Sequence, residues 1–276
     1  MILIDGHENG CIDAGDRGFQ YGDGLFETVD ISNSVPTFLD AHLDRLFDGA
    51  MRLFITMPDR KVLEQEASAL AVYQKEGVLK IIVTRGSGGR GYRPLDNSKP
   101  LRVLSTHPRP EYPATVQASG IKAMLCNTRL GHNPNLAGIK HLNRLEQVLA
   151  RSEWRETDIL EGLMLDQTGF VIEGTMSNLF LVEGNCLYTP KLDRCGVAGI
   201  IRKMIIDYAR KNNFVVKISR ITLAKVMRAE ELFFTNSVIG VWPVSVLEEH
   251  RYRVGPISSQ IGNWIAEQKQ RQAITR

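Results

Sequence analysis

Several features that mark other classes of protein are missing from this chain of 276 residues. No apolar run approaches the roughly 20 residues that a membrane-spanning helix needs, so no membrane partner is expected. Cysteine is scarce, and the four present form no CxxC pair, which excludes a structural zinc site and a disulfide framework; no metal is expected. The first residues reach Asp5 and Gly6 too soon for a secretory signal, so a cytoplasmic location is expected.

The chain also lacks a large excess of either positive or negative charge. The formal net charge is +3, and no dense group of basic residues is interleaved with aromatic ones, so nucleic-acid binding is not expected. The slight positive balance suits an anionic small-molecule substrate. The hydrophobic fraction of 43% and the charged fraction of 24% match those of globular proteins, and the length allows one large domain or two modest ones.

The periodicity of apolar residues predicts a mixed α and β chain, of class α+β. In the first half, an apolar stripe from Leu43 to Phe54 indicates a helix, with Asp40 as its expected N-cap and Arg45 outside the stripe. The run Val78–Thr84 is expected to be a buried strand because it is almost wholly apolar. The other elements expected before residue 106 are an opening strand, a turn running into a strand at 22–29, a helix at about 60–75 and a strand at 101–105.

Prolines mark the expected domain boundary. Three of them lie between residues 108 and 113, where they forbid a helix and discourage a strand. We therefore predict an N-terminal α/β domain over 1–108, an interdomain linker over 109–118 and a C-terminal domain over 119–276. The elements expected in the C-terminal domain are strands near 120–126, 159–165, 177–182, 186–189 and 231–235, and helices from about 143, near 199, near 221–228 and over 257–271.

A glycine-rich segment at 86–91 reads Gly-Ser-Gly-Gly-Arg-Gly and fits the GxGxxG pattern of dinucleotide-binding folds. That fingerprint requires a helix to begin at the last glycine, because the helix N-terminus meets the pyrophosphate. Here the chain continues through Pro94 and Pro100, which excludes that helix and disfavours a nicotinamide oxidoreductase. We instead expect a flexible loop that carries Arg90 and Tyr92 over a site, since glycines permit closure and arginine binds carboxylates bidentately.

A long gapped pattern begins at Glu173. It reads Glu173-Gly-Thr-Met-Ser-Asn178-Leu-Phe, then Leu187-Tyr-Thr, then Val197-Ala-Gly199-Ile200-Ile201-Arg. This pattern resembles the signature of the class IV aminotransferases, the fold-type IV enzymes of pyridoxal 5′-phosphate (PLP). The resemblance implies a two-domain architecture like that of the D-amino acid aminotransferases, with PLP bound by the C-terminal domain and the site between the domains.

PLP needs an amine that binds its aldehyde, a partner for its pyridine nitrogen, a phosphate site and a base. The resemblance implies that Lys140 forms the Schiff base and acts as the base, and that Glu173 lies beside the pyridine nitrogen. It implies phosphate contacts from Arg45 and from a helix start, where unpaired N–H groups and the positive end of the dipole suit an anion. The cofactor-binding residues implied besides Lys140, Glu173 and Arg45 are Asn178, Gly199, Ile200, Ile201, Asn236 and Ser237. Taken singly, each also has an ordinary structural explanation, such as a surface lysine or a solvated helix arginine.

Two further segments resemble those of the aminodeoxychorismate lyases, one branch of this family. They are the stretch from Arg85 to Tyr92 and the stretch from Arg129 to Gln147. Branched-chain aminotransferases tend to carry a tyrosine five residues after the lysine, where this chain has Leu145. The resemblance implies a lyase of folate biosynthesis that converts 4-amino-4-deoxychorismate to 4-aminobenzoate and pyruvate.

In that reaction Lys140 would remove the proton from the amine-bearing ring carbon, and the enolpyruvyl group would then be eliminated. Lys140 or the hydroxyl of Thr28 would protonate the leaving group. Arg90 and Tyr92 would contact the substrate, which carries two carboxylates. The family resemblance also leads us to expect a homodimer.

Alternative functions remain at this point. A class IV aminotransferase acting on branched-chain or D-amino acids shares the first chemical step and would transfer the amino group to a keto acid. A catalytically silent PLP-binding or folate-pathway partner protein would release no product, although the retained lysine and glutamate argue against that.

Overall fold

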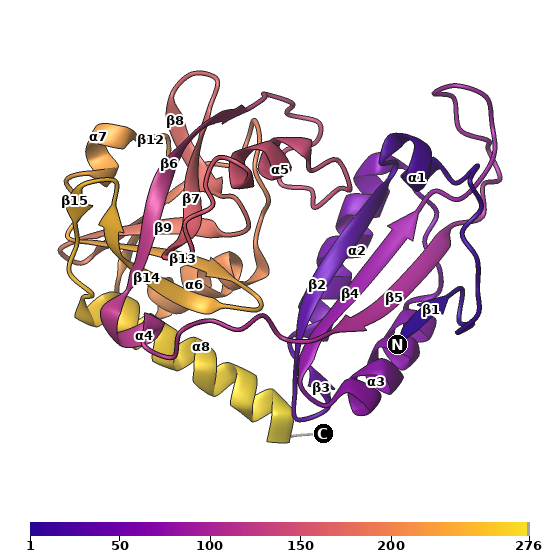
Figure 1. The fold of residues 1–276 in the computed structure, drawn as a ribbon, viewed down its shortest axis with the longest axis horizontal. Coiled ribbons are helices and arrows are strands. Elements are labelled where there is room, and N and C mark those ends of the chain that lie inside the picture. The colour runs from indigo at the N-terminus through magenta and orange to yellow at the C-terminus, as the bar shows by residue number, and fades with distance from the viewer. Residues whose placement is uncertain (275–276) are drawn as a thin grey trace. The chain divides into compact units, whose positions relative to one another are not determined.

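The structure is a computed structural model that describes residues 1–274 as two compact units, each with its own sheet and core (Figure 1). Unit 1 comprises Met1–Glu111, the short segment Ile139–Asn143 and the residues from Gln268 onward. Unit 2 comprises Tyr112–Gly138 and Arg144–Glu267. The mixed α and β class expected from the sequence is confirmed. The segment that contains Lys140 thus belongs to the unit built mainly from the first 111 residues.

The sheet of unit 1 has five strands in the order β1-β5-β4-β2-β3, and all neighbouring strands are antiparallel. Helices α2 and α3 cover one face of this sheet, where their leucines share one apolar core with buried strand residues. The elements of unit 1 are β1 (Ile2–Ile4), α1 (Arg17–Tyr21), β2 (Gly24–Ser32), β3 (Val35–Pro36), α2 (Leu39–Leu53), α3 (Arg60–Gln74), β4 (Gly77–Thr84) and β5 (Leu101–His107).

The expected N-cap of helix α2 is wrong. The cap position is Phe38, whose left-handed backbone (φ 55°) turns the chain into the helix while Leu39 enters the core. Asp40 lies inside the first turn, where its carboxylate is favoured by the positive end of the helix dipole. Helix α3 has the expected bounds because Asp59 caps it, accepting a hydrogen bond from the Lys61 N–H at 2.9 Å.

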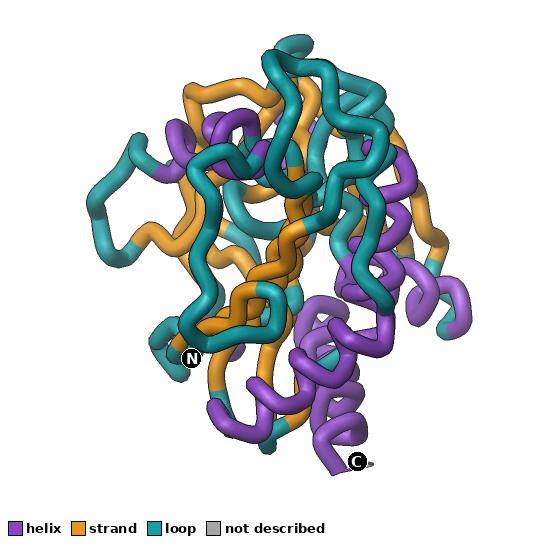
Figure 2. Tube along the Cα trace, turned by 90° about the vertical axis from the view of Figure 1, so that its right-hand side faces the viewer, coloured by secondary structure: helices purple, strands orange, loops and turns teal. Residues whose placement is uncertain are grey.

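The sheet of unit 2 runs in the order β11-β10-β9-β13-β14-β6-β7-β8-β12, with the short β15 beside β14. Phe180 on β9 and Phe233 on β13 are directly opposite each other and stack with ring centroids 5.2 Å apart. The strands are β6 (Ile121–Leu130), β7 (Ile159–Asp166), β8 (Phe170–Gly174), β9 (Asn178–Glu183), β10 (Cys186–Pro190), β11 (Val215–Ser219), β12 (Ile221–Thr222), β13 (Glu231–Asn236), β14 (Gly240–Leu247) and β15 (His250–Arg251). The helices are α4 (Val116–Ser119), α5 (Leu145–Arg151), α6 (Ile200–Lys211), α7 (Leu223–Val226) and α8 (Pro256–Ile274, next to the C mark in Figure 2).

Among the strands of five or more residues, β8, β11 and β14 have no counterpart among the sequence expectations. Strand β14 begins at Gly240 and contains Pro243, two residue types that disfavour a strand interior. Burial of Val241, Trp242 and Val244 in the core of unit 2 outweighs that local preference.

The helix expected near 221–228 is shorter than its pattern suggested. Ile221 is fully buried and pairs with Val171 as part of β12, so only the single turn of α7 remains helical. No residue between Gly91 and Pro100 is helical, which confirms that the glycine-rich segment does not open a dinucleotide-binding helix. Within residues 1–274, no helix combines the length and the apolar character needed to cross a bilayer.

Candidate active site

Lys140 lies on a segment that runs along an edge of strand β2. The N–H of Phe26 donates to the Lys140 carbonyl at 3.1 Å, and the N–H of Leu142 donates to the Gly24 carbonyl at 3.0 Å. These two bonds make Lys140 the cross-strand neighbour of Phe26, and its Nζ lies 4.2 Å from the centroid of the Phe26 ring. Lys140 therefore projects from the same face of the sheet as Phe26.

Strand alternation places Thr28 on that face as well. Leu25, Glu27 and Val29 are buried beneath the helices, whereas Phe26 and Thr28, which alternate with them, are half-buried. The two residues predicted to be catalytic, Lys140 and Thr28, are thus brought to one face of unit 1, opposite the face covered by α2 and α3. We call this the open face.

Arg45, the predicted phosphate ligand on α2, forms a double hydrogen bond with Glu27. Its Nε donates to Oε1 at 2.8 Å and its Nη2 donates to Oε2 at 2.5 Å. Glu27 is fully buried, and the Nδ1–H of His42, also fully buried, donates to it at 2.6 Å. Burial by itself raises the pKa of Glu27, but Arg45 and His42 outweigh it and lower that pKa to about 2. Burial lowers the pKa of His42, so its imidazole is neutral at neutral pH.

The loop with Arg90 and Tyr92 is fastened to unit 1 by a buried arginine. Arg17 donates from Nη1 to the Gly91 carbonyl at 3.0 Å and from Nη2 to the Tyr92 carbonyl at 2.9 Å. Its third donor, Nε, binds Asp23 at 2.9 Å. The side chains of Arg90 and Tyr92 are exposed, so Arg17 holds two consecutive carbonyls of the loop and leaves these side chains accessible.

We expect Arg17→Lys to loosen this loop without unfolding unit 1. A lysine keeps the charge near Asp23 but cannot donate to two neighbouring carbonyls in one plane. Losing one such charge-assisted bond should raise trypsin cleavage after Arg90 about tenfold or more. The matched control is Arg85→Lys, because Arg85 binds Asp23 but none of the loop carbonyls. Equal cleavage of both variants would show that Arg17 does not hold the loop.

Unit 2 gathers its predicted residues around the start of helix α6. The carboxylate of Glu173, at the end of β8, accepts a hydrogen bond from the Val197 N–H at 2.8 Å. The side-chain amide of Asn178 donates to the Val197 carbonyl at 2.8 Å and lies 3.4 Å from the same Glu173 oxygen. The segment before α6 is thus held through both the N–H and the carbonyl of Val197. Glu173 is only 4% exposed.

Helix α6 begins at Ile200 with Gly199 as its cap, and no side chain caps its first N–H groups. A Cβ on Gly199 would lie 1.9 Å from the Asn178 Oδ1, so only glycine allows this approach. The first-turn N–H groups of a helix have no partner within the helix and carry a partial positive charge. The start of α6, with Ile200 and Ile201, therefore suits a phosphate group.

Asn236 and Ser237 reach the same region through strand pairing. Thr235 on β13 is directly opposite Asn178 on β9. The side-chain oxygen of Asn236 accepts hydrogen bonds from the N–H groups of residues 238 and 239, both at 2.9 Å, and its amide donates to the Met176 carbonyl at 3.1 Å. Asn236 therefore shapes the turn that presents Ser237, whose side chain is 9% exposed.

Several charged residues near Glu173 carried no role in the sequence interpretation. Burial lowers the pKa of Arg202 to about 10 and also lowers the pKa of Arg144, while the negative charge of Glu173 opposes both shifts. Arg202 donates to the Thr189 hydroxyl at 3.0 Å. Arg202 belongs to the pattern recognised in the sequence, but only the structure shows that the charge of Glu173 acts on it.

Glu161 is another buried carboxylate of unit 2, and it stands outside the motifs recognised in the sequence. It accepts hydrogen bonds from the hydroxyl and N–H of Thr175, at 2.6 and 2.9 Å, and from the Ser177 hydroxyl at 2.5 Å. Burial raises the pKa of Glu161, and these bonds oppose the shift. Glu161 thereby fixes the turn between Glu173 and Asn178.

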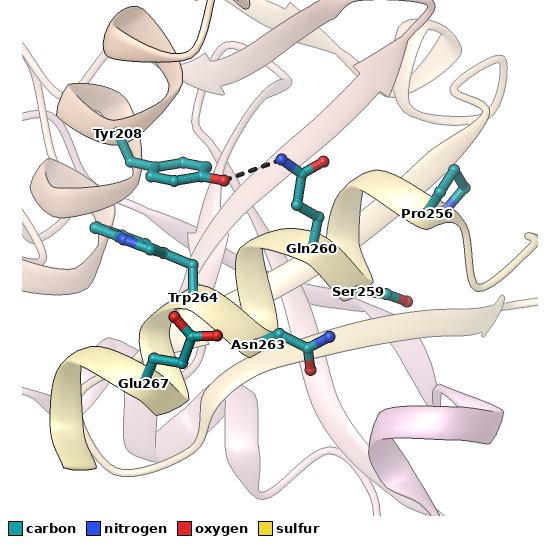
Figure 3. A pocket seen from close by; sticks show the side chains of 7 residues that line it. All are labelled: Tyr208, Pro256, Ser259, Gln260, Asn263, Trp264 and Glu267. Atoms are coloured by element: carbon teal, nitrogen blue, oxygen red, sulfur yellow. Dashed lines mark hydrogen bonds between the residues drawn. The ribbon is translucent and has the colours of Figure 1, made fainter. Parts of the chain in front are cut away.

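A separate hollow of about 480 Å³ lies between α6 and α8 (Figure 3). Tyr208 and Trp264 stack there at 4.3 Å, and Gln260 donates to the Tyr208 hydroxyl at 3.0 Å. Among the described residues that line it, Glu267 alone is charged, and none of them is a cation that could bind a phosphate or carboxylate. None of the residues predicted from the sequence lines this hollow.

Comparison with known proteins decides the family. The model of the family described as "Amino-transferase class IV" matches residues 24–247, from the start of β2 to the end of β14. The chain belongs to the class IV aminotransferase family. The match covers residues of both units, including Lys140 and Glu173.

Individual relatives agree with this assignment. Aminodeoxychorismate lyase of Vibrio harveyi is 37% identical over 89% of this chain and 90% of its own length. The crystal structure of 4-amino-4-deoxychorismate lyase from Pseudomonas aeruginosa is 43% identical, covers 97% of this chain and 98% of its own, and has a TM-score of 0.93. A D-alanine aminotransferase of Listeria monocytogenes is 27% identical over 97% of this chain and 95% of its own length.

Proposed function

We propose that this chain is a PLP-dependent lyase that converts 4-amino-4-deoxychorismate to 4-aminobenzoate and pyruvate. The observation that carries this function is the likeness of nearly the whole chain to two lyases of that name, at 37% and 43% identity. The residues fit the cofactor: one lysine on the open face, a buried carboxylate and a helix start that suits a phosphate. Class IV aminotransferases share the fold, and relatives named as such, a putative branched-chain aminotransferase at 31% identity and a D-alanine aminotransferase at 27%, are weaker matches.

Each site residue then has a defined task. When bound, PLP withdraws electrons from the carbon that bears the substrate amine. Lys140 would hold the cofactor covalently, and its free amine would take the proton from the substrate carbon. Glu173, oriented by Val197 and Asn178, supplies negative charge at the pyridine nitrogen. The residues proposed to bind the phosphate or line its site are Arg45, Asn178, Gly199, Ile200, Ile201, Asn236 and Ser237.

Elimination breaks the bond between the ring carbon and the enolpyruvyl oxygen, and a proton must reach the leaving group to give pyruvate. Thr28 lies on the open face with Lys140 and can relay this proton through its hydroxyl. We expect Thr28→Val to lower turnover about 100-fold, with Thr28→Ser close to the unchanged protein, measured as pyruvate release. Full turnover in Thr28→Val would assign this proton to Lys140 alone.

The experiment that tests the function supplies PLP-loaded protein with 4-amino-4-deoxychorismate and measures 4-aminobenzoate and pyruvate together. Equal release of both over many turnovers is the expected result. Amino transfer to a keto acid without 4-aminobenzoate would identify an aminotransferase instead. Bound PLP with no product from any amine would identify a silent PLP-binding protein.

The chain is further proposed to act as a cytoplasmic homodimer. Helix α5 supports this, since Leu145, Val148 and Leu149 expose apolar side chains that a second copy would cover. Light scattering on the purified protein should give twice the mass of one chain, 30.9 kDa. A single-chain mass at micromolar concentration would contradict the dimer.

A further inference from the structure

A row of polar side chains crosses the open face of unit 1. Thr28 on β2 is directly opposite Lys80 on β4, and Lys80 is directly opposite Ser105 on β5. Directly opposed residues of antiparallel strands project from the same face. The row therefore lies on the face that carries Lys140, and Lys80 stands at its centre.

Lys80 is placed close to the proposed catalytic lysine. Its Nζ lies 5.5 Å from the centroid of the Phe26 ring, the same ring that the Lys140 Nζ approaches to 4.2 Å. Phe26 separates two ammonium groups that come from β4 on one side and from the Lys140 segment on the other. Two like charges beside one ring favour the binding of an anion between or beside them.

Partial burial of the Lys80 ammonium group costs free energy unless an anion binds beside it. It is half-buried on β4, the middle strand of the sheet, in the otherwise apolar run Val78–Val83. In the part of unit 1 that the structure describes, no carboxylate lies within ion-pair distance of its ammonium group. Lysine is disfavoured in central strands, and a partly desolvated ammonium needs a counter-charge. The fold therefore provides an unmatched cation beside Thr28 and Lys140.

We propose that Lys80 binds the carboxylate of the enolpyruvyl group, the part of the substrate that leaves as pyruvate. This inference rests on the proposed lyase function. Thr28, the proposed proton donor to that leaving group, is directly opposite Lys80. A leaving group within reach of the Thr28 hydroxyl is therefore also within reach of the Lys80 ammonium group. Lys80 makes the carboxylate of the leaving group a recognised feature of the substrate.

The test compares Lys80→Met with Lys80→Arg and with the control Lys61→Met. Lys61 is an exposed lysine on α3, the helix that covers the opposite face, so its loss changes the net charge equally. We expect Lys80→Met to raise the KM for 4-amino-4-deoxychorismate roughly 10- to 100-fold while kcat changes less than about threefold. Lys80→Arg should keep most of the affinity, and Lys61→Met should match the unchanged protein.

Product inhibition identifies which carboxylate Lys80 binds. In Lys80→Met, inhibition by pyruvate should weaken about tenfold, while inhibition by 4-aminobenzoate should stay within about twofold. A thermal shift with each product gives the same comparison without turnover. An unchanged KM, or a loss of 4-aminobenzoate inhibition instead of pyruvate inhibition, would overturn the assignment. Absence of product from the unchanged protein would instead refute the proposed function, so the two failures are distinguishable.

Discussion

Lys140→Ala should abolish covalent attachment of PLP and lower lyase turnover by about 10²- to 10⁴-fold. Both effects have the same cause, because the lysine amine is the group that binds the cofactor and the base that moves the substrate proton. Absorbance of the bound cofactor reports the first effect, and release of 4-aminobenzoate reports the second. Borohydride reduction followed by peptide mass spectrometry then shows which lysine carried the cofactor.

Lys80→Met is the matched control for this experiment, since Lys80 is the second lysine beside Phe26. It should keep the label on Lys140 and keep the absorbance of the bound cofactor. A label on Lys80 in the unchanged protein would contradict the assignment of Lys140. A variant Lys140→Ala that still turns over at more than a tenth of the original rate would contradict its role as the base.

The elements predicted well from the sequence are those whose pattern is local. The bounds of helix α3 and strand β4 agree with the expectation within a few residues, and helix α6 begins where it was expected. Strand β14 was missed because Pro243 argues against a strand, and only tertiary burial explains it. Local pattern could not supply that burial.

The candidate site divides in the same way. Lys140, Glu173 and the start of α6 were selected because they stand in a recognisable pattern along the chain. Lys80 and Arg17 were not selected, because their roles depend on residues distant in the sequence. Lys80 is opposite Thr28, and Arg17 binds the carbonyls of Gly91 and Tyr92. The glycine-rich loop was expected to be flexible because glycine permits many conformations, but two bonds from one buried arginine restrict it.

Glu27→Gln should lower the free energy of unfolding by about 3 kcal/mol or more, because it removes one member of a buried ion pair. The amide keeps the shape of the carboxylate but leaves the charge of Arg45 without its buried partner. Urea unfolding at pH 7 measures the change. The control is Glu64→Gln, which breaks the more exposed pair of Glu64 with Arg60, and it should cost less than about 0.5 kcal/mol.

The pH dependence distinguishes a lost charge from a lost shape. The pKa of Glu27 is about 2 in the folded chain against 4.5 ordinarily, so the unfolded chain binds its proton first as the pH falls. The stabilisation by Glu27 is therefore complete above about pH 4.5 and is lost as the pH falls toward 2. The pKa of the buried His42 is lowered from its ordinary value of 6.5. The folded protein therefore also loses stability through His42 as the pH falls below about 6.5.

The contribution of the Glu27 charge to the difference in unfolding free energy between the unchanged protein and Glu27→Gln should thus shrink between pH 4.5 and 3. A difference that stayed constant through this range would mean that Glu27 acts through packing and not through its charge. The same variant should weaken PLP binding, because Glu27 fixes two donors of Arg45 and with them the direction of the remaining guanidinium N–H groups. Unweakened PLP binding together with lost stability would confine the role of Glu27 to the core of unit 1 and remove Arg45 from the proposed phosphate site.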